Sequence, residues 1–283
     1  MLKEFGTPEF SVSVSGISNI EQVRGISEIR QEEGFDFPIS LGYQLSNKNI
    51  NQGTHNPRQP RFEDLGDLHE ETYASGLITA IHYYTKDNET ILSDLERIKD
   101  VVRPGFSLLQ FNTLPPTKDI LRKAKEMGFE VIFKVAVSDK KSPQGGYAVW
   151  KGEEVQDVKG GRIDPLFFQV QEREEVIDYV MFDPSHGTNL DLELEENSLA
   201  IRFGKKITAR RNMDHLNLVY AGGIKPSNVG TVVRSLNSFF PSRFSIDIES
   251  GVRRNDILDL DLVREYLANY QSAFERIANS PTI

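Results

Sequence analysis

The sequence predicts an α/β protein of the closed (β/α)₈ barrel class, built as one domain over residues 1–283. Eight apolar runs rich in strand-forming residues alternate with amphipathic stretches, which is typical of a parallel sheet covered by helices. The chain is long enough, and with 38% hydrophobic residues apolar enough, for one large core. The alternation also fits a doubly wound sheet. The count of eight and the residues at the strand ends favour the closed barrel.

The predicted strands share a β-rich, apolar composition and end at small or polar residues. They are expected at Phe10–Ile17, Phe37–Leu45, Leu77–Thr85, Phe106–Thr113, Glu130–Ser138, Val176–Asp183, Leu216–Ile224 and Arg243–Ser250.

Most of the connections carry helix signals. Asn19 is a suitable N-cap for the first helix, and Gly34 ends it. The pair Pro115–Pro116 suits the start of the fourth helix. The helices are expected at Ile20–Gly34, Glu63–Ser75, Asn88–Val102, Thr117–Gly128, Asn197–Lys206, Pro226–Leu236 and Leu260–Ile277.

One connection, residues 138–175 after the fifth strand, is too long for an ordinary loop of this fold. It carries the only tryptophan, Trp150, within the run "GYAVWKG", which together with "EEVQDV" predicts a small hairpin. In a barrel this segment belongs to the face where the strands end. Two interpretations stay open: a decorative or oligomerising insertion, and a lid over the site.

Composition excludes several function classes. The chain has no cysteine, which excludes disulfides, thiolate metal ligands and a cysteine nucleophile or base. The net charge of −9 without a long basic run argues against nucleic acid as a partner. No apolar run reaches the ~20 residues that span a membrane, and the start of the chain lacks a secretory pattern. We therefore expect a cytoplasmic protein without cofactor or metal, and the sequence leaves an oligomer open.

Small residues follow the last two predicted strands. Gly222 and Gly223 end the seventh strand, and Ser250 and Gly251 end the eighth. Residues without Cβ atoms let backbone N–H groups approach an anion closely, and the helix that follows adds a favourable field. In (β/α)₈ barrels the loops after strands seven and eight often bind phosphate. The pattern predicts that these four residues hold a phosphorylated small molecule.

The same segments resemble a known family. "AGGIKPSNV" followed by "IDIESGV" is similar to the AGG-x-x-P-x-N-V and D-x-S-SGVE segments of phosphoribosylanthranilate isomerase, a TIM barrel of tryptophan biosynthesis. The resemblance is specific over Leu218–Arg253. Weaker matches are "VSVSGISNIEQV", "RQPRF" and "DYVMFDPSHG". The segments 138–175 and 46–60 have no counterpart in that family, and the family's cysteine near the start of the chain is absent from this sequence.

The resemblance implies an aldose–ketose isomerase that opens an aminoribose phosphate and forms a ketone, using an acid and a base. By resemblance the acid is Asp183. The family's base is a cysteine at the position of Ser15, and a serine hydroxyl needs activation to act as a base. His82 or His186 are the candidates to activate it or replace it. Arg61 matches the family arginine that holds the anthranilate carboxylate.

Other chemistries also fit parts of the sequence. Lys134 lies in an apolar strand, where a lysine can form a Schiff base as in aldolases. A metal site built from His82, Asp183 and His186 lacks a defined ligand spacing. The replacement of the family cysteine favours a third reading, in which the barrel binds a sugar phosphate without turning it over.

Overall fold

The chain forms a closed barrel of eight parallel strands, which confirms the predicted (β/α)₈ TIM-barrel class. The computed structural model describes residues 11–103, 105, 107–112, 116–135, 137–141, 147–151, 154–157, 163–184, 192–241 and 243–278. The barrel strands are β1 (Val12–Ser15), β2 (Ile39–Ser46), β3 (Ile78–Tyr84), β4 (Ser107–Phe111), β5 (Glu130–Lys134), β9 (Tyr179–Phe182), β10 (Asn217–Ala221) and β11 (Phe244–Ile248). Strand β1 pairs with β2 on one side and with β11 on the other, which closes the ring.

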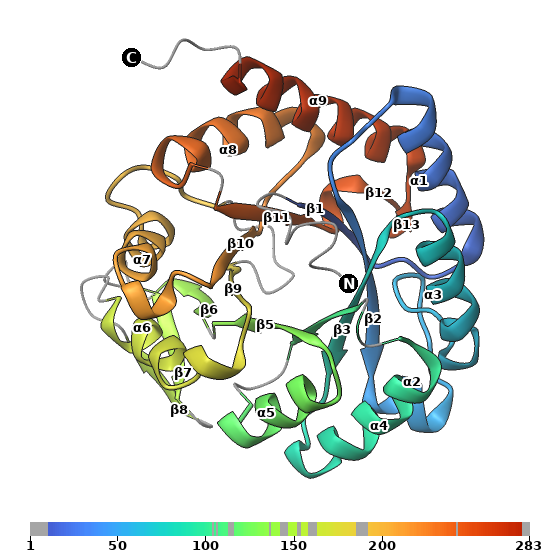
Figure 1. Cartoon of the computed structure of the whole chain (residues 1–283), viewed down its shortest axis with the longest axis horizontal. Coiled ribbons are helices and arrows are strands. Elements are labelled where there is room, and N and C mark those ends of the chain that lie inside the picture. Colours follow the sequence, from blue (N-terminus) through green and yellow to red (C-terminus); the bar gives the residue numbers. More distant parts are fainter. Residues whose placement is uncertain are drawn as a thin grey trace.

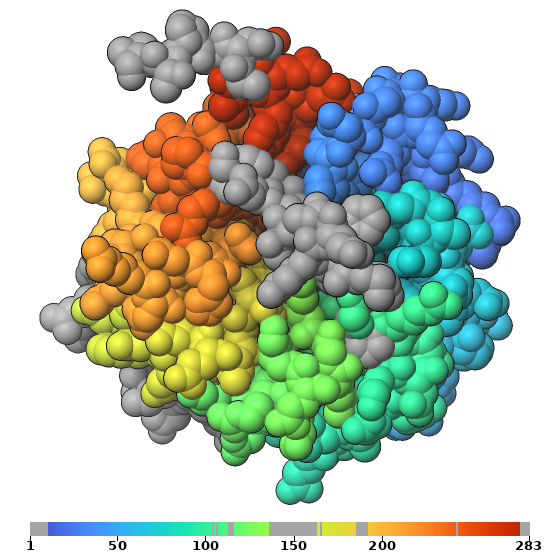
Figure 2. Space-filling model, viewed as in Figure 1, coloured from blue at the N-terminus to red at the C-terminus, as the bar shows by residue number. Residues whose placement is uncertain are grey.

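A ring of helices surrounds the strands, and at least one helix follows each of them (Figure 1). The helices are α1 (Ile20–Glu33), α2 (Asn47–Gln52), α3 (Leu65–Ala74), α4 (Ile91–Val101), α5 (Lys118–Glu126), α6 (Asp164–Gln171), α7 (Leu199–Thr208), α8 (Pro226–Phe239) and α9 (Leu260–Ala278). Colours follow one another around the molecule in sequence order, because each βα unit packs beside the preceding one (Figure 2).

Local capping explains where these helices start and stop. Asn19 accepts a hydrogen bond from the backbone N–H of Gln22 at 3.1 Å, and Gly34 ends α1 with a left-handed φ of 68°. Thr117 and Ser198 cap α5 and α7 in the same way as Asn19. The capping signals read from the sequence thus mark both ends of α1, whereas the cap of α5 is Thr117, which directly follows the predicted proline pair.

Several short elements decorate this framework. They are η2 (Phe62–Asp64), η3 (Asn88–Thr90), η5 (Glu174–Val176), η6 (Arg211–Met213), η7 (Ser250–Val252), and the two-stranded β12 (Arg253–Arg254) and β13 (Ile257–Leu258). After β5 comes an antiparallel sheet of β6 (Val137–Lys141), β7 (Tyr147–Lys151) and β8 (Glu154–Asp157). Strands β7 and β8 pair as the expected hairpin.

The segment 138–175 also contains a barrel helix, α6, that the sequence analysis did not foresee. Other parts of the segment lie outside the described residues. The expectation that it serves as an insertion or lid therefore stays a prediction. Within the described residues no helix is long and apolar enough to cross a membrane.

The interior of the barrel is divided by polarity. Apolar side chains from β3, β4, β5, β9 and β10 form one inner cluster: Ala80, Leu108, Ile132, Tyr179, Met181, Val219 and Ala221. The opposite wall, from β1, β2 and β11, carries Ser13, Ser40 and Ser245. The large core lies between the strands and the helices, as in other barrels of this class. The polar wall therefore leads up to the carboxyl ends of β1 and β11.

Candidate active site at the carboxyl ends of the strands

A pocket opens where β9, β10 and β11 end. Its lining consists of Arg58, Asp183, Ala221, Gly222, Gly223, Ile224, Asp247, Ile248, Glu249 and Ser250. We refer to it as the mouth pocket. Three of the four glycine and serine residues predicted to hold phosphate line this pocket, and it also contains the predicted acid Asp183. The fold thus brings residues from distant parts of the sequence to one opening.

The turn after β10 needs glycine for conformational reasons. Gly222 and Gly223 have φ values of 101° and 62°, a region that side chains with a Cβ atom rarely adopt. Asn228, in the first turn of α8, donates to the carbonyl oxygen of Gly223 at 2.9 Å and accepts from the N–H of Lys225 at 2.8 Å. The Asn228 side chain therefore ties both the β10 side and the α8 side of this loop to the first turn of α8.

The turn after β11 packs against this loop. A Cβ atom on Gly251 would lie 2.1 Å from the carbonyl oxygen of Ile224, so only glycine fits there. Ser250 lines the pocket in front of it, and both residues belong to η7. The two small-residue turns thus form adjoining walls, the geometry expected for a phosphate cradle.

Asp183 is held by a lysine. The Nζ of Lys134, at the end of β5, lies 2.6 Å from Oδ2 of Asp183, which follows β9. The side chains are 14% and 10% exposed, so water screens this ion pair poorly. Lys134 faces the interior, as does Ile132 two residues earlier, because side chains two apart on a strand point to the same face.

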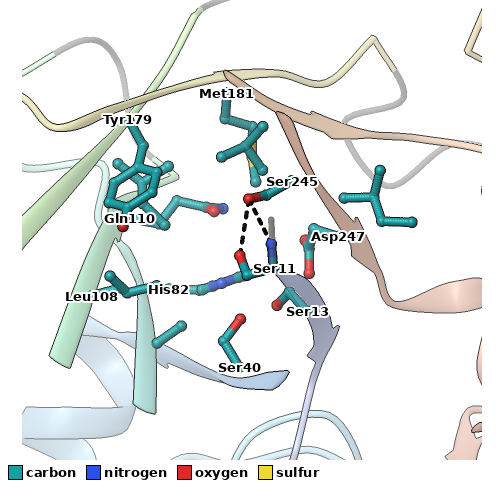
Figure 3. A pocket seen from close by; sticks show the side chains of 14 residues that line it. Ser11, Ser13, Ser40, His82, Leu108, Gln110, Tyr179, Met181, Ser245 and Asp247 are labelled. Atoms are coloured by element: carbon teal, nitrogen blue, oxygen red, sulfur yellow. Dashed lines mark hydrogen bonds between the residues drawn. The ribbon is translucent and has the colours of Figure 1, made fainter. Parts of the chain in front are cut away.

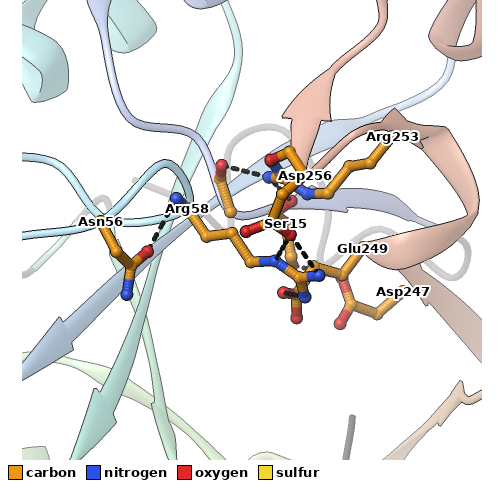
Figure 4. Close-up of polar contacts among 8 residues, drawn as sticks. Ser15, Asn56, Arg58, Asp247, Glu249, Arg253 and Asp256 are labelled. Carbon is orange, nitrogen blue, oxygen red and sulfur yellow. Dashed lines mark hydrogen bonds and ion pairs between the residues drawn. The ribbon is translucent and has the colours of Figure 1, made fainter. Parts of the chain in front are cut away.

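Ser15 contacts a second carboxylate, Asp247. The hydroxyl of Ser15 at the end of β1 donates to Oδ1 of Asp247 on β11 at 2.5 Å (Figure 4). Room for this hydroxyl exists because β2 carries Gly42, whose Cβ would lie 2.3 Å from Oγ of Ser15. Ser15 itself is fully buried.

The surroundings of Asp247 favour its protonated form. Burial is the largest cause, and the negative charges of Glu249 and Asp183 add to it; together they raise the pKa of Asp247 to about 7. Hydrogen bonds from Ser15 and Ser13 act in the opposite direction, because they stabilise the ionised form. The Asp247 carboxyl therefore changes its charge near neutrality.

Two arginines fasten the loops around the pocket, and the sequence analysis singled out neither. Arg58 binds Glu249 at 2.7 Å and Asp256 at 2.5 Å, which ties the loop after β2 to the loop after β11 (Figure 4). Arg253 donates to the backbone carbonyl oxygens of Ser15, at 3.2 Å, and of Gly16. The first and last barrel strands are thus connected by side chains at the mouth as well as by the sheet.

Arg61, predicted to hold a carboxylate, is exposed and does not line the mouth pocket. It precedes η2, three positions beyond Arg58 in the same "RQPRF" segment. Its assigned role stays a prediction. The "RQPRF" segment contains both Arg58 and Arg61, so the same sequence signal could have been assigned to Arg58.

His82 lies below the mouth, in a small chamber inside the barrel (Figure 3). The chamber is also lined by Ser13, Ser40, Gln110 and Asp247. His82 is 3% exposed, and burial together with the charge of Lys134 lowers its pKa to about 3. The imidazole is therefore neutral at ordinary pH. His82 does not line the mouth pocket.

Asp247 lines both the chamber and the mouth pocket. It is therefore the carboxylate that connects the polar interior of the barrel with the opening where a substrate would enter. In the described part of the chain no three side chains are grouped as ligands for a metal ion. His186, named with His82 and Asp183 for such a site, lies outside the described residues.

No protein-family model and no curated protein sequence matches the chain. N-(5'-phosphoribosyl)anthranilate isomerase from Pyrococcus furiosus is 16% identical, with a TM-score of 0.55 over 93% of this chain and 99% of that chain. A phosphoribosylanthranilate isomerase solved in complex with reduced 1-(o-carboxyphenylamino)-1-deoxyribulose 5-phosphate is 18% identical, with a TM-score of 0.56 over 93% and 99%. Triosephosphate isomerase from Bartonella henselae is 12% identical, with a TM-score of 0.55 over 93% and 98%.

These likenesses cover nearly the whole chain at low sequence identity. They accordingly establish the architecture and leave the chemistry to be argued from the site. The chain has a TIM-barrel fold similar to that of the phosphoribosylanthranilate isomerases.

Proposed function

We propose that the protein is an aldose–ketose isomerase acting on a phosphorylated sugar or its amino derivative. The observation that carries this proposal is the arrangement of the mouth pocket, where two separately held carboxylates adjoin a pair of glycine turns. Such an isomerisation needs a group that gives a proton, a group that takes one, and an anchor for the phosphate. The pocket offers a candidate for each role within one opening.

The anchor is the double turn formed by Gly222, Gly223, Ser250 and Gly251. Its support is threefold: left-handed glycines after β10, contact between the two loops, and the N-terminus of α8 directly behind them. One of the similar structures holds a sugar 5-phosphate derivative, which agrees with this assignment without proving it.

The acid is the Lys134–Asp183 pair. In the proposed reaction the ammonium of Lys134 supplies the proton, which reaches the ring oxygen of the sugar through Asp183, and the bond between that oxygen and C1 then breaks. Asp183 was predicted for this role by resemblance, and its support here is its place in the pocket, 10% exposed and held by Lys134. A carboxyl in such a site is oriented before the substrate arrives.

The second proton-transfer group is formed by Ser15 and Asp247. Ser15 was predicted as the base, and its hydroxyl donates to Asp247, a geometry suited to moving a proton between them. His82, the other predicted base, lies in the chamber below and is a weak base because of its low pKa. We therefore propose no proton transfer by His82 and regard it as a structural residue of the inner chamber.

The proposal is tested with N-(5'-phosphoribosyl)anthranilate, whose fluorescence is lost as it isomerises, and with a panel of aldose phosphates followed by NMR. We expect turnover of at least one of these compounds, and a loss of at least about 100-fold in Asp183→Asn. Glu196→Gln, which changes an exposed carboxylate on the outside, is the matched control. Ser15→Cys tests whether the site supports the base of the similar family.

Two other functions give different outcomes in the same experiment. Binding of the sugar phosphates without turnover would favour a non-catalytic barrel. A Schiff-base aldolase would instead be trapped on Lys134 by borohydride in the presence of substrate. We expect no such adduct, because the Nζ that would attack the carbonyl carbon is bound to Asp183.

An anthranilate derivative would need a partner for its aryl carboxylate. Arg61 remains the residue that we propose for it, and Arg58 is the comparison, since Arg58 lines the pocket and Arg61 does not. If an aryl substrate is used, Arg61→Ala raises its KM several-fold and leaves the KM of a simple aldose phosphate unchanged. An equal effect on both substrates would contradict a role in aryl binding.

A further inference from the structure

Asp247 occupies a special position among the acidic residues of the mouth. Its strand register places it beside Ala221, the last residue of β10 before Gly222 and Gly223. A sugar whose phosphate sat on those glycines would extend over the ends of the strands, where this carboxylate lines the pocket. Asp247 is thus within one strand spacing of the proposed anchor.

We infer that Asp247 is the catalytic base, which takes the proton from the sugar carbon next to C1, and that Ser15 is a positioning residue for it. The inference rests on the proposed function and names the group that performs one of its steps. It differs from the expectation that Ser15 or His82 removes the proton.

Ser15 is suited to orienting this carboxylate rather than to acting alone. Its hydroxyl proton is directed at Oδ1 of Asp247 over 2.5 Å, and its Oγ is enclosed by β2 at Gly42. Any proton that Ser15 took would have to pass on to Asp247, the only base of the pair with a suitable pKa. A serine hydroxyl in this place fixes the carboxylate by a short hydrogen bond.

The charged groups facing Asp247 come from several elements. Asp183 after β9 and Glu249 after β11 raise its pKa, while Arg58, which lines the same pocket, is bound to Glu249. Tyr266 of α9 is also within electrostatic range. A carboxyl that is ionised near pH 7 and still attracts a proton is matched to removing one from carbon.

The step balances without any further reactant. After ring opening, C1 is double-bonded to oxygen in an aldose, or to a positively charged nitrogen in an aminosugar. Asp247 takes the proton from C2, the C–H electron pair forms a C1–C2 double bond, and the electrons of the C1 double bond move onto the heteroatom. Asp247 then returns its proton to C1. The C2 hydroxyl proton passes to the negatively charged O1 of an aldose, or back to the Lys134–Asp183 pair in the case of an aminosugar, and the ketone is formed.

The test uses the full chain in D₂O with N-(5'-phosphoribosyl)anthranilate and the aldose phosphate panel. Deuterium incorporated from solvent into the product is followed by NMR, and the pH dependence of kcat is measured for each variant. We expect Asp247→Asn to lose at least about 100-fold in kcat. Asp261→Asn, an exposed aspartate in the first turn of α9, should keep the wild-type rate.

Ser15→Ala separates positioning from catalysis. Loss of the hydrogen bond raises the pKa of Asp247, because Ser15 stabilises its ionised form. A base works only when ionised, so the rising limb of the pH profile should move to higher pH while a large share of the maximal rate remains. A titration of ¹³C-labelled aspartate carboxyls should show one group near neutrality, absent in Asp247→Asn and shifted upward in Ser15→Ala.

The outcomes distinguish a failure of the proposed function from a failure of the role inferred for Asp247. A wild-type protein that exchanges no proton with any probe overturns the proposed function and this inference with it. A wild type that turns over while Asp247→Asn, folded by circular dichroism, keeps its rate overturns the inference alone. So does a pH profile that Ser15→Ala leaves unmoved.

Discussion

Two lysine–aspartate pairs connect the α5–β5 unit to the residues that flank β9, one at the amino end of the barrel and one at the carboxyl end. At the amino end, Lys125 of α5 lies 2.5 and 2.6 Å from the two carboxylate oxygens of Asp178, which also accepts from the backbone N–H of Val131. At the carboxyl end, Lys134 holds Asp183 at 2.6 Å inside the mouth pocket. The residue types are identical, and their surroundings differ.

The two carboxylates differ in their surroundings: Asp178 connects secondary-structure elements, and Asp183 lines a pocket. Asp178 ties α5 and the start of β5 to the start of β9, and the pair is 35% and 28% exposed. Asp183 lines an opening that contains the two small-residue turns proposed to hold phosphate and a second carboxylate, and its pair is 14% and 10% exposed. In barrels of this class stability is concentrated at the amino face and chemistry at the carboxyl face. The same substitution should therefore affect activity at the carboxyl end and stability alone at the amino end.

The largest effect is expected for the two aspartates themselves. Asp183→Asn should lower kcat at least about 100-fold, and it should also lower the free energy of unfolding, because it removes the carboxylate charge that neutralises the buried ammonium of Lys134. Asp178→Asn should lower the free energy of unfolding by about 1–2 kcal/mol, since it weakens bonds to Lys125 and Val131, and leave kcat unchanged. Urea denaturation and kinetics check both. Equal effects of the two variants on activity would break the comparison.

Two glycines with left-handed φ values, one at each end of the barrel, allow the same comparison for the binding of a sugar phosphate. Gly223→Asp places a negative charge in the cradle and should weaken binding of a sugar phosphate by about 100-fold, measured by calorimetry. Gly34→Asp introduces the same residue at a similar φ, 68° against 62°, at the amino end. We expect it to leave the affinity unchanged. Unaltered binding by Gly223→Asp would refute the phosphate assignment.

Packing of the two cradle loops gives a smaller effect. Gly251→Ala forces a methyl group against the carbonyl oxygen of Ile224 and should cost about 2 kcal/mol of stability. Gly66→Ala, in α3 with only an ordinary contact at 3.5 Å, should be neutral or slightly stabilising. Thermal denaturation of both proteins measures the difference. A harmless Gly251→Ala would mean that the loops separate easily.

An effect confined to acidic pH concerns the chamber between the two ends. The pKa of His82 is lowered to about 3, so its contribution is present above the unfolded pKa and is lost as the pH falls below about 6.5. Between pH 7 and pH 5 this loss amounts to about 2 kcal/mol. In His82→Gln the stability should fall less over this range. His215→Gln, an exposed histidine, is the control and should follow the wild type.

The fold was predictable because the alternation of a strand-like run and an amphipathic stretch is repeated along the chain. Eight apolar runs separated by amphipathic stretches are hard to mistake, even though single boundaries shift: the predicted strand Val176–Asp183 shortens to β9 at Tyr179–Phe182. Helix α6 was missed because it follows the long segment after β5. Its signals, Asp164 and Pro165 before an apolar run, were present but were read as part of the insertion.

The site was predictable only in part. The glycine turns stand out locally, since their residue type alone reports an unusual backbone. Asp247 was noticed as part of a motif, but its place in the pocket depends on how β11 pairs with β1 and β10. The same holds for Arg58, whose partners lie 191 and 198 residues away. Contacts of that length are set by tertiary packing, which no local pattern reports.

Ser15 and Asp247 are 232 residues apart in the chain and share one hydrogen bond. During synthesis β1 leaves the ribosome early and cannot acquire its partner until β11 follows. A growing or truncated chain can contain Lys134 and Asp183 and still lack the second carboxylate of the mouth. Under the proposed function, the pairing of β11 with β1 is thus also the step that completes the catalytic site.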